Sequence, residues 1–583
     1  MKLATATCVV LLSGSSYVLS AAAPAPPEPQ HPAELVTLTE EFRDWRRAEP
    51  GEVPDYVKRV EEQKRGLAEF RRRLASLAPR DWPIHAQVDY LLLLIEMNAL
   101  EFDLNVIRQV SRNPDFYTTE AVNGVRRNIG RRYQMGPRVT VPYDAGRAAA
   151  IIEALDKTSA IVEQAPNGLT EAVPEMADMA LERLEDVQEG YAEFTNVVGP
   201  HLPEPYRSQI GPAAERAGAA LAKYARWIEQ NRSGMGAPYV IGRPALDWHV
   251  QRVKAMPFDS DDLLMQGEME RNRNWAFLQF ERQKNSHLPS HGGVAQQPLR
   301  PAKSKAEYSE WKDATDVLTR MWAEELELFT RPDYLGPMRH EDGMVWIEPF
   351  EDMAFPSEPK PQGTKTEFVG GPDSWHASIY SEVGHYLDPG VNHVHSDYPG
   401  HTFERAVSQK TTCELRRRHN TRGDAWCYYI EELQLQLDYP FVRGPRAREW
   451  MYSLGIWRAE RLYLTVLLAD GSMTPKQAEQ HMLDNVPWME TYVARRHETW
   501  RKFVRPTHTL TYQVGKFQVY KLLMDRMRQL GEGFNLRDFH DALLATGQIP
   551  ISLARWEMTG NDEDVKHLWE AVPIPGAAVG SSR

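Results

Sequence analysis

The stretch HVHSDYPGH at residues 393–401 places His393, His395 and His401 close together, with a Pro-Gly pair before the last of them. Imidazole is the commonest protein ligand of zinc and is also a general base near neutral pH. On an unbroken α-helix, His395 and His401 would point about 120° apart, so they can meet at one metal ion only if Pro399-Gly400 bends the backbone. The stretch is therefore either a metal site or a histidine-rich surface loop.

A second segment, DAWCYYIEE at residues 424–432, combines acidic and aromatic side chains. In a helix, offsets of four and seven residues bring Asp424, Tyr428 and Glu431 onto one face. Asp424 is therefore predicted to complete a site of two histidines and one carboxylate. The alternative is an amphipathic helix whose acids, Glu431 and Glu432 above all, are solvated.

A third pair of segments is TYQVGK at 511–516 and FNLRDFHDALL at 534–544. A tyrosine hydroxyl that reaches a cleft can stabilise an oxyanion or transfer a proton, and Tyr512 is the candidate here. The alternative is a packing role, which is the commoner use of tyrosine.

Composition limits the partners of this chain. Its 583 residues are 42% hydrophobic, which is ample for a large core, and the formal net charge is −13. Nucleic acid is not expected as a partner, because phosphate binding needs a basic footprint. The local run Arg416-Arg417-Arg418-His419 is either a solvated surface or a binding site for an anionic substrate group.

The N-terminus has the pattern of a secretory signal. Lys2, an apolar stretch to about residue 19 and Ala21-Ala22-Ala23 predict a signal peptide at 1–23, and a Pro-rich leader follows at 24–34. No later apolar run reaches the length of a membrane span. We therefore expect a periplasmic or secreted protein that is not membrane-bound after cleavage. Cys413 and Cys427 then remain, and one bridge between them is possible.

Most of the chain beyond the leader has helical spacing of apolar residues, so a mainly α fold is predicted. The clearest stretches are 88–110, 148–162, 176–198, 308–328 and 450–468. A Pro/Gly/Ser-rich break at 284–303 divides an N-terminal helical half, 35–283, from a C-terminal half, 304–575, that carries the chemistry. The break is either a domain boundary or a surface insertion. Short strands are predicted at 344–347 and 376–380, the latter leading toward the histidines.

Together these segments resemble a large family of zincin-like bacterial proteins known as domain of unknown function 885. The family pattern H-E-A-x-P-G-H-H-L-Q corresponds to HSDYPGHTFE at 395–404, and E-G-W-A-x-Y-x-E corresponds to DAWCYYIE at 424–431. Its Y-x-x-G and F-D-L-x-x-F-H-D-x-x-L elements correspond to 512–515 and 534–544, and an R-N-P element corresponds to 112–114. The resemblance covers essentially the whole mature chain. It implies a large helical zincin-like fold with a central cleft.

The chain departs from the family at positions that carry chemistry. The resemblance implies a glutamate general base after the first histidine, but Ser396 stands there, and a serine hydroxyl is no base near neutral pH. The shorter Asp424 replaces a glutamate in the second segment, and Glu404 stands where the family has glutamine. Because His395 and His401 are retained, a metal site is still expected.

Three functions fit this pattern. The first is an exported, zinc-dependent, peptidase-like hydrolase, in which His395, His401 and Asp424 bind zinc. In that hypothesis Glu404, Asp397 or a third histidine, His393, is the base, and Tyr512 stabilises the oxyanion. The second is a lyase that acts by β-elimination on a glycan containing uronic acid, with His393 or His395 and Tyr512 as base and acid. The third is a catalytically degenerate binding protein. The predicted contacts to a peptide or anionic glycan are Arg416, Arg417 and Tyr428.

Overall fold

The computed structural model describes residues 32–48, 52–129, 142–288, 305–332, 388–408, 414–416, 421–489, 491 and 493–576. Within these ranges the chain is built from helices, and no described residue lies in a strand. This confirms the prediction of a mainly α fold. The signal peptide, most of the leader and the two predicted strands lie outside the described residues. No helix in the described ranges combines the length and the apolar character needed to cross a bilayer.

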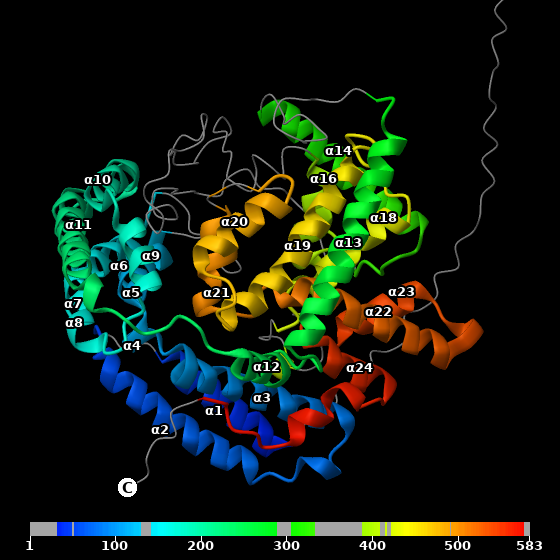
Figure 1. Cartoon of the computed structure of the whole chain (residues 1–583), viewed down its shortest axis with the longest axis horizontal. Coiled ribbons are helices and arrows are strands. Elements are labelled where there is room, and N and C mark those ends of the chain that lie inside the picture. The colour runs from blue at the N-terminus through cyan, green and yellow to red at the C-terminus, as the bar shows by residue number, and fades with distance from the viewer. Residues whose placement is uncertain are drawn as a thin grey trace, which may run out of the picture.

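The first part of the chain forms helices that follow one another closely (Figure 1). They are α1 (Ala33–Arg47), α2 (Tyr56–Ala75), α3 (Ile84–Phe102), α4 (Gln109–Arg112), α5 (Pro114–Ile129), α6 (Ala145–Asp156), α7 (Thr158–Val162), α8 (Ala165–Gly168), α9 (Pro174–Leu184), α10 (Val187–Val198) and α11 (Tyr206–Asn231). The predicted stretch 176–198 is interrupted after Leu184, because Asp186 takes the left-handed conformation with φ of 53°. The stretch predicted at 88–110 contains most of α3 and, after it, a π-helical segment, η2 (Asp103–Ile107).

The second part contains the longer helices and all the segments quoted for the site. They are α12 (Arg243–Arg252), α13 (Ser260–Lys284), α14 (Lys305–Glu325), α16 (Pro389–Asn392), α17 (His401–Ser408), α18 (Ala425–Gln436), α19 (Ala447–Ala469), α20 (Pro475–Asn485), α21 (Arg501–Val504), α22 (Leu510–Leu530), α23 (Leu536–Ala545) and α24 (Ile551–Thr559). Two π-helical segments, η6 (His393–Asp397) and η8 (Val493–Trp500), lie among them. The leader is shorter than predicted, since α1 begins at Ala33.

Helix α18 is the centre of the second part. Every residue from Ala425 to Leu435 is buried, so this helix is enclosed on all sides rather than amphipathic. Its apolar side chains share one core with residues of α3, α22, α23 and α24. Figure 1 accordingly shows α3, near the start of the chain, running beside α24, near its end. The division of the chain at 284–303 stays a prediction.

The family-like segment at 534–544 has a structural role. His540 on α23 is fully buried, and its Nδ1 and Nε2 lie 2.8 Å from the Leu328 carbonyl oxygen and 2.8 Å from the Tyr429 hydroxyl. Burial lowers the pKa of His540 to about 4, so its ring is neutral at pH 7. A neutral ring can donate through one nitrogen and accept through the other. His540 therefore links α23 to α18 and to the segment that follows α14.

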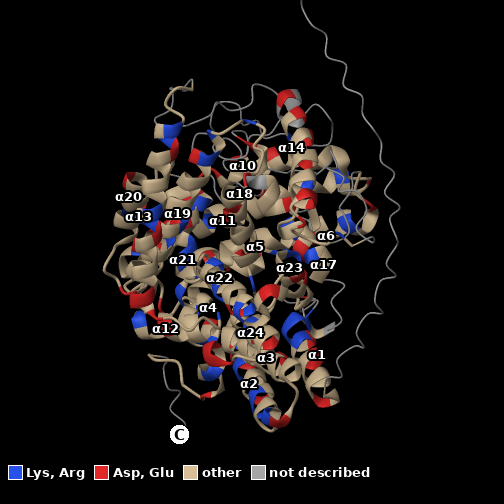
Figure 2. Cartoon of the chain, turned by 90° about the vertical axis from the view of Figure 1, so that its right-hand side faces the viewer, with Lys and Arg blue, Asp and Glu red and all other residues tan. Residues whose placement is uncertain are grey.

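The surface carries mixed charge. In the view of Figure 2, lysine and arginine alternate with aspartate and glutamate along the helices of this face, and no single-sign surface dominates it. This agrees with the net charge of −13 in giving no basic footprint for nucleic acid on this face.

Candidate metal centre

The bend predicted at Pro399-Gly400 brings the two histidines together. The chain leaves η6 after Asp397, turns through residues 398–400 and starts α17 at His401. Gly400 permits the turn because a Cβ there would lie 2.0 Å from the carbonyl oxygen of His395. The rings of His395 and His401 have centroids 5.0 Å apart and stand perpendicular to each other.

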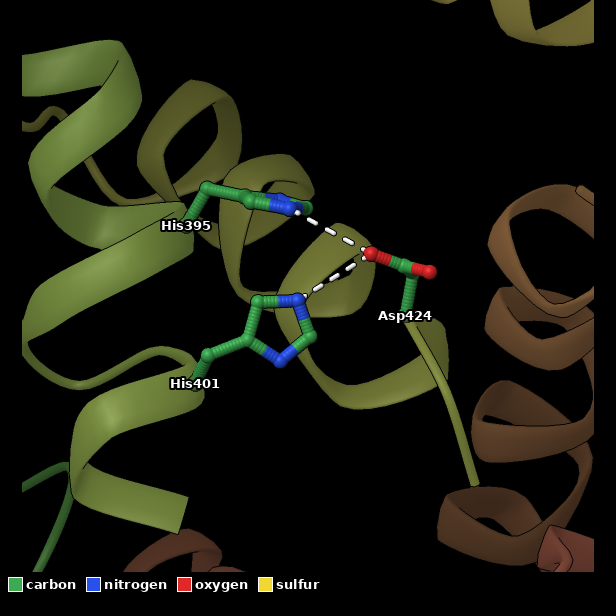
Figure 3. A group of neighbouring side chains, drawn as sticks. All are labelled: His395, His401 and Asp424. Carbon is green, nitrogen blue, oxygen red and sulfur yellow. Dashed lines mark hydrogen bonds and ion pairs between the residues drawn. The ribbon is translucent and has the colours of Figure 1, made fainter. Parts of the chain in front are cut away.

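Both rings face one carboxylate. The Nε2 atoms of His401 and His395 lie 3.1 Å and 3.4 Å from Oδ1 of Asp424, which precedes the first turn of α18 (Figure 3). One potential ligand atom from each of the three residues lies within 4.8 Å of the others. Residues separated by 29 positions in the sequence thus form one cluster, which we call the His₂Asp cluster: His395, His401 and Asp424.

A close helix contact completes the cluster. Gly515 on α22 lies against α18, where an added Cβ would be 2.4 Å from the Cβ of Ala425. The spacing Tyr512-x-x-Gly515 therefore sets the first turn of α22 beside Asp424. The ring of Tyr512 stacks parallel to that of His395, with the ring centroids 6.0 Å apart.

Glu431 orients His395 from the buried side. Its Oε1 is 2.6 Å from Nδ1 of His395, and both of its carboxylate oxygens accept hydrogen bonds from Arg458 on α19. A histidine that donates through Nδ1 to a carboxylate keeps its Nε2 lone pair for a metal ion, and such partners are usual in metal sites. Glu431 is 1% exposed, so the solvated acid considered as its alternative is excluded.

The electrostatics of the cluster depend on these contacts. Burial opposes ionisation of Asp424, but its hydrogen bonds with His395 and His401 outweigh burial and hold the pKa of its carboxyl well below the usual range. Burial likewise disfavours the charged form of His395, whereas Asp424 and Glu431 raise its pKa overall. The side chains of His395, His401 and Asp424 are 15%, 18% and 19% exposed, so each of them is only partly buried.

The donor set fits a borderline ion such as zinc. Two imidazole nitrogens and one carboxylate oxygen are the ligand types of three-residue zinc sites, and the Glu431 contact supplies the expected outer partner. A second group, formed by His401, Glu404 and Cys427, also has ligand atoms within 4.8 Å of one another. Its Glu404 is already engaged by Arg422 and Gln548, at 3.1 Å and 3.0 Å. The His₂Asp cluster is therefore the better metal site.

Of the three predicted catalytic residues, Tyr512 lies beside the His₂Asp cluster, whereas Glu404 and His393 are held in other contacts. Glu404 is fully buried beneath His401, in the ion pair with Arg422. His393 is also buried, 3.3 Å from Asp397 and 3.6 Å from Asp316, on the side of η6 that faces α14.

The predicted substrate residues face the interior. Arg416 is 3% exposed and donates to Asp89 on α3 and to Glu557 on α24. Tyr428 is 4% exposed, with the Arg458 guanidinium 4.4 Å from its ring centroid. Contacts within the protein thus occupy the side chains of both residues, where substrate contacts were predicted. Arg417 and Cys413 lie outside the described residues, and Cys427 is a buried free cysteine.

Sequence reasoning missed the residues that support the cluster from a distance. Arg458 and Arg461 lie one turn apart on α19, and their guanidinium carbons are 5.3 Å and 5.0 Å from the Tyr512 ring centroid. An arginine spacing of three residues is too common to single out. One signal was present in the sequence: the charged residues of α19 are distributed all around the helix and do not gather on one face, which indicates a buried helix. The structure shows α19 buried along most of its length.

The protein is thus a helical protein with a His₂Asp cluster, and sequence comparison identifies its family. The chain belongs to the family described as "Bacterial protein of unknown function (DUF885)", which matches residues 47–558. None of the curated proteins compared with the sequence matches it.

Two solved structures share the fold. One, from Shewanella oneidensis, is of a protein of unknown function described as a lipoprotein; it is 13% identical with a TM-score of 0.63, over 90% of this chain and 100% of that one. The other, from Colwellia psychrerythraea, is also described as a lipoprotein; it is 17% identical with a TM-score of 0.61, over 86% and 91% of the two chains. At these identities the likeness concerns the fold alone.

Proposed function

We propose that this protein is an exported, zinc-dependent hydrolase of peptide substrates, related to the zincins in its use of a helical metal site. The observation that carries the proposal is the convergence of two Nε2 atoms on Asp424 Oδ1, with Glu431 holding the Nδ1 of His395. Three protein ligands leave a fourth position for water or substrate, which is the pattern of catalytic zinc sites.

Zinc held by His395, His401 and Asp424 would act as a Lewis acid and would acidify bound water. The protein supplies the groups around it. Burial, and then the charge of Asp424, raise the pKa of Tyr512 far above its usual value, so its hydroxyl stays protonated. A protonated tyrosine beside the metal ligands can donate a hydrogen bond to a developing oxyanion. The same protonated hydroxyl would also suit the acid of an elimination reaction, so activity assays must separate the two reactions.

The site provides poorly for one step, the removal of a proton from the attacking water. Ser396 cannot accept a proton at neutral pH, and the carboxylate of Glu404 is engaged by Arg422 and Gln548. Loss of general-base assistance lowers a rate by about two to four orders of magnitude. We therefore expect slow hydrolysis of simple peptides by the wild-type protein. Ser396→Glu should raise that rate, because it adds a carboxylate beside the ligands.

Metal analysis is the first test. Protein purified without chelators should contain one zinc ion per chain, and His401→Ala should lose it. His287→Ala is the matched control, because His287 is exposed and lies outside the cluster. A His401→Ala variant that retains full zinc content would refute the assignment of the ligands.

Activity is the second test. Wild type, Ser396→Glu and Tyr512→Phe are assayed on peptides and on uronate glycans in ¹⁸O-labelled water. Incorporation of the label into a peptide product, faster with Ser396→Glu and slower with Tyr512→Phe, is the expected result. An unsaturated glycan product without label would instead establish a lyase. Inactivity of all three proteins on both substrates would contradict an enzyme of either kind.

Export is supported by the charge and apolar pattern of residues 1–23 and by the two similar structures, both described as lipoproteins. The mature chain is expected to start between about Ala22 and Ala25. Amino-terminal sequencing of material from the periplasm or medium checks this. A chain in the membrane fraction that still begins near Lys2 would show an anchor instead.

A further inference from the structure

Helix α13 does not follow the usual pattern of a surface helix. It runs beside α19 (Figure 1), and an added Cβ at Gly267 would lie 3.2 Å from the Cβ of Leu462 on that helix. The side of α13 that faces inward carries polar residues, since Glu270 and Asn274 are only 6% and 3% exposed. The Glu270 carboxylate accepts a hydrogen bond of 3.1 Å from Lys516, and the Asn274 amide donates to the Glu270 carbonyl oxygen at 2.7 Å. Polar contacts therefore form a large part of the inner face.

The outer face of α13 is apolar. Met265, Met269 and Phe280 are 54%, 65% and 64% exposed, and Ala276 is exposed as well. On an α-helix these four side chains fall within an arc of about 60°, on the side away from Glu270. We call the four residues the α13 stripe. Apolar residues that are exposed singly are ordinary, but a stripe at helical spacing is the pattern that packs against a second helix.

The charges along α13 are divided between its two halves. Residues 260–270 contain no lysine or arginine and have the acids Asp261, Asp262, Glu268 and Glu270. Residues 271–284 contain one acid, Glu281, and the cations Arg271, Arg273, Arg282 and Lys284. Acids at the start and cations at the end suit the dipole of a single helix, but that effect is confined to the terminal turns, whereas Glu268 and Arg271 lie near the middle. Two copies of α13 laid in opposite directions would bring the acidic half of each beside the basic half of the other.

Some of these charges already have partners on the same chain. Glu270 and Arg273 belong to a largely buried network with Lys516 and Glu432. At the exposed start of the helix, Asp261 lies 2.8 Å from Arg243, with its own side chain 84% exposed.

A surface pair of that kind contributes little energy and leaves the carboxylate accessible to a second charge. Glu268 in the first half and Lys284 in the second are exposed. The outer side of α13 therefore combines an apolar stripe with opposite charges toward its two ends.

We propose that two copies of this protein associate through α13, with the two helices antiparallel and their α13 stripes in contact. With a two-fold axis between residues 272 and 273, Met265 of one copy lies opposite Phe280 of the other, and Met269 lies opposite Ala276. The same register sets Asp261 opposite Lys284 at each end. Because the contact is isologous, every one of these pairs occurs twice.

The size of the contact sets its strength. Helix α13 has 25 residues, so it is about 37 Å long and about 10–12 Å wide with its side chains. One face of such a helix offers a partner a few hundred Å², which is less than the roughly 800 Å² per partner of a standard interface. The dimer is therefore reversible, with a Kd in the micromolar range, and dissociates on dilution.

Equilibrium sedimentation of the mature protein is the first test, over concentrations that span about two orders of magnitude around the micromolar range. Wild type should pass from monomer to dimer. Met269→Lys should raise the Kd at least about tenfold, because it places two ammonium groups in the apolar contact. Met524→Lys is the matched control on α22, where Met524 is 42% exposed, and it should dimerise like wild type. Thermal unfolding verifies that each variant is folded.

Cysteine crosslinking tests the direction of the helices. Met265→Cys and Phe280→Cys proteins are oxidised separately and as a mixture. The two positions lie about 22 Å apart along one helix, so an antiparallel pair should form the disulfide-linked dimer in the mixture and not in either variant alone. Wild type under the same oxidant is the control for the native cysteines, of which Cys427 is buried.

Several results would overturn the proposal. A wild type that stays monomeric over the whole range is one, and a Met269→Lys protein that dimerises like wild type is another. Weaker dimers of Met524→Lys with an unchanged Met269→Lys would move the contact to α22. Crosslinking of Met265→Cys with itself would refute the antiparallel arrangement. A monomeric wild type that co-sediments with phosphatidylglycerol vesicles would assign the α13 stripe to a lipid surface instead.

Discussion

Glu431→Gln tests the outer partner of the metal site with a minimal change of shape. Wild-type Glu431 accepts hydrogen bonds from both terminal nitrogens of Arg458, and its Oε1 also contacts Nδ1 of His395. A glutamine cannot accept at both positions. If the glutamine amide nitrogen faces Arg458, its N–H points at an N–H of the guanidinium and no hydrogen bond forms there. If it faces His395, the ring must accept at Nδ1 and carry its proton on Nε2, which then cannot bind a metal ion.

The expected effects have two separate magnitudes. Loss of the outer partner should weaken zinc binding about 10–100-fold. Neutralising one member of a buried ion pair should lower the free energy of unfolding by about 3–5 kcal/mol, because the Arg458 charge stays buried. Both side chains of this pair are largely inaccessible, at 1% and 6% exposed, so solvent screens the loss only weakly.

Zinc affinity is measured on metal-free protein with a competing chromophoric chelator, and stability is measured by urea unfolding. Glu498→Gln is the matched control. Glu498 is likewise buried and accepts two hydrogen bonds from one arginine, Arg461, but it contacts none of the three ligands. It should lose similar stability and keep its zinc affinity. Unchanged zinc affinity in Glu431→Gln, or an equal loss in both variants, would refute the role assigned to Glu431.

Three further changes test how the fold builds the site. Gly515→Ala should lower the unfolding free energy by about 1–3 kcal/mol, because the added Cβ overpacks against α18. Gly124→Ala is the control and should be neutral or stabilising, because its added Cβ meets only an ordinary contact at 3.7 Å. Equal effects of the two changes in urea unfolding would contradict the close packing at Gly515. Because the pKa of His540 is about 4 in the fold and about 6.5 when unfolded, stability should fall by about 3 kcal/mol as pH drops through that window, and His540→Gln should flatten the urea–pH profile. Arg422→Met should cost about 3–5 kcal/mol by leaving Glu404 unpaired, and Arg422→Met with Glu404→Gln should recover part of it; a single variant as stable as wild type would show that the pair is dispensable.

Much of the fold was accessible from local sequence. The apolar spacing of 308–328 and 450–468 is a property of the residues themselves, and helices α14 and α19 form there. The motifs at 395–404, 424–431 and 512–515 also pointed to the family that matches the chain. Interruptions were harder to predict, because the break at Asp186 depends on a single left-handed residue rather than on hydrophobic period.

The sequence by itself determined which residues are capable of metal chemistry: His395, His401 and Asp424 stood out by residue type and by the Pro-Gly bend between the histidines. The tertiary structure decided how each charged residue is used. Glu431, taken for a solvated acid, becomes the buried partner of His395, while Arg416, taken for a substrate contact, joins α3 to α24. These outcomes depend on partners 27 to 327 residues away in the chain, such as Arg458 and Asp89. A carboxylate or guanidinium has the same local pattern in water and in a core, and only the packing of distant helices determines which charge it meets.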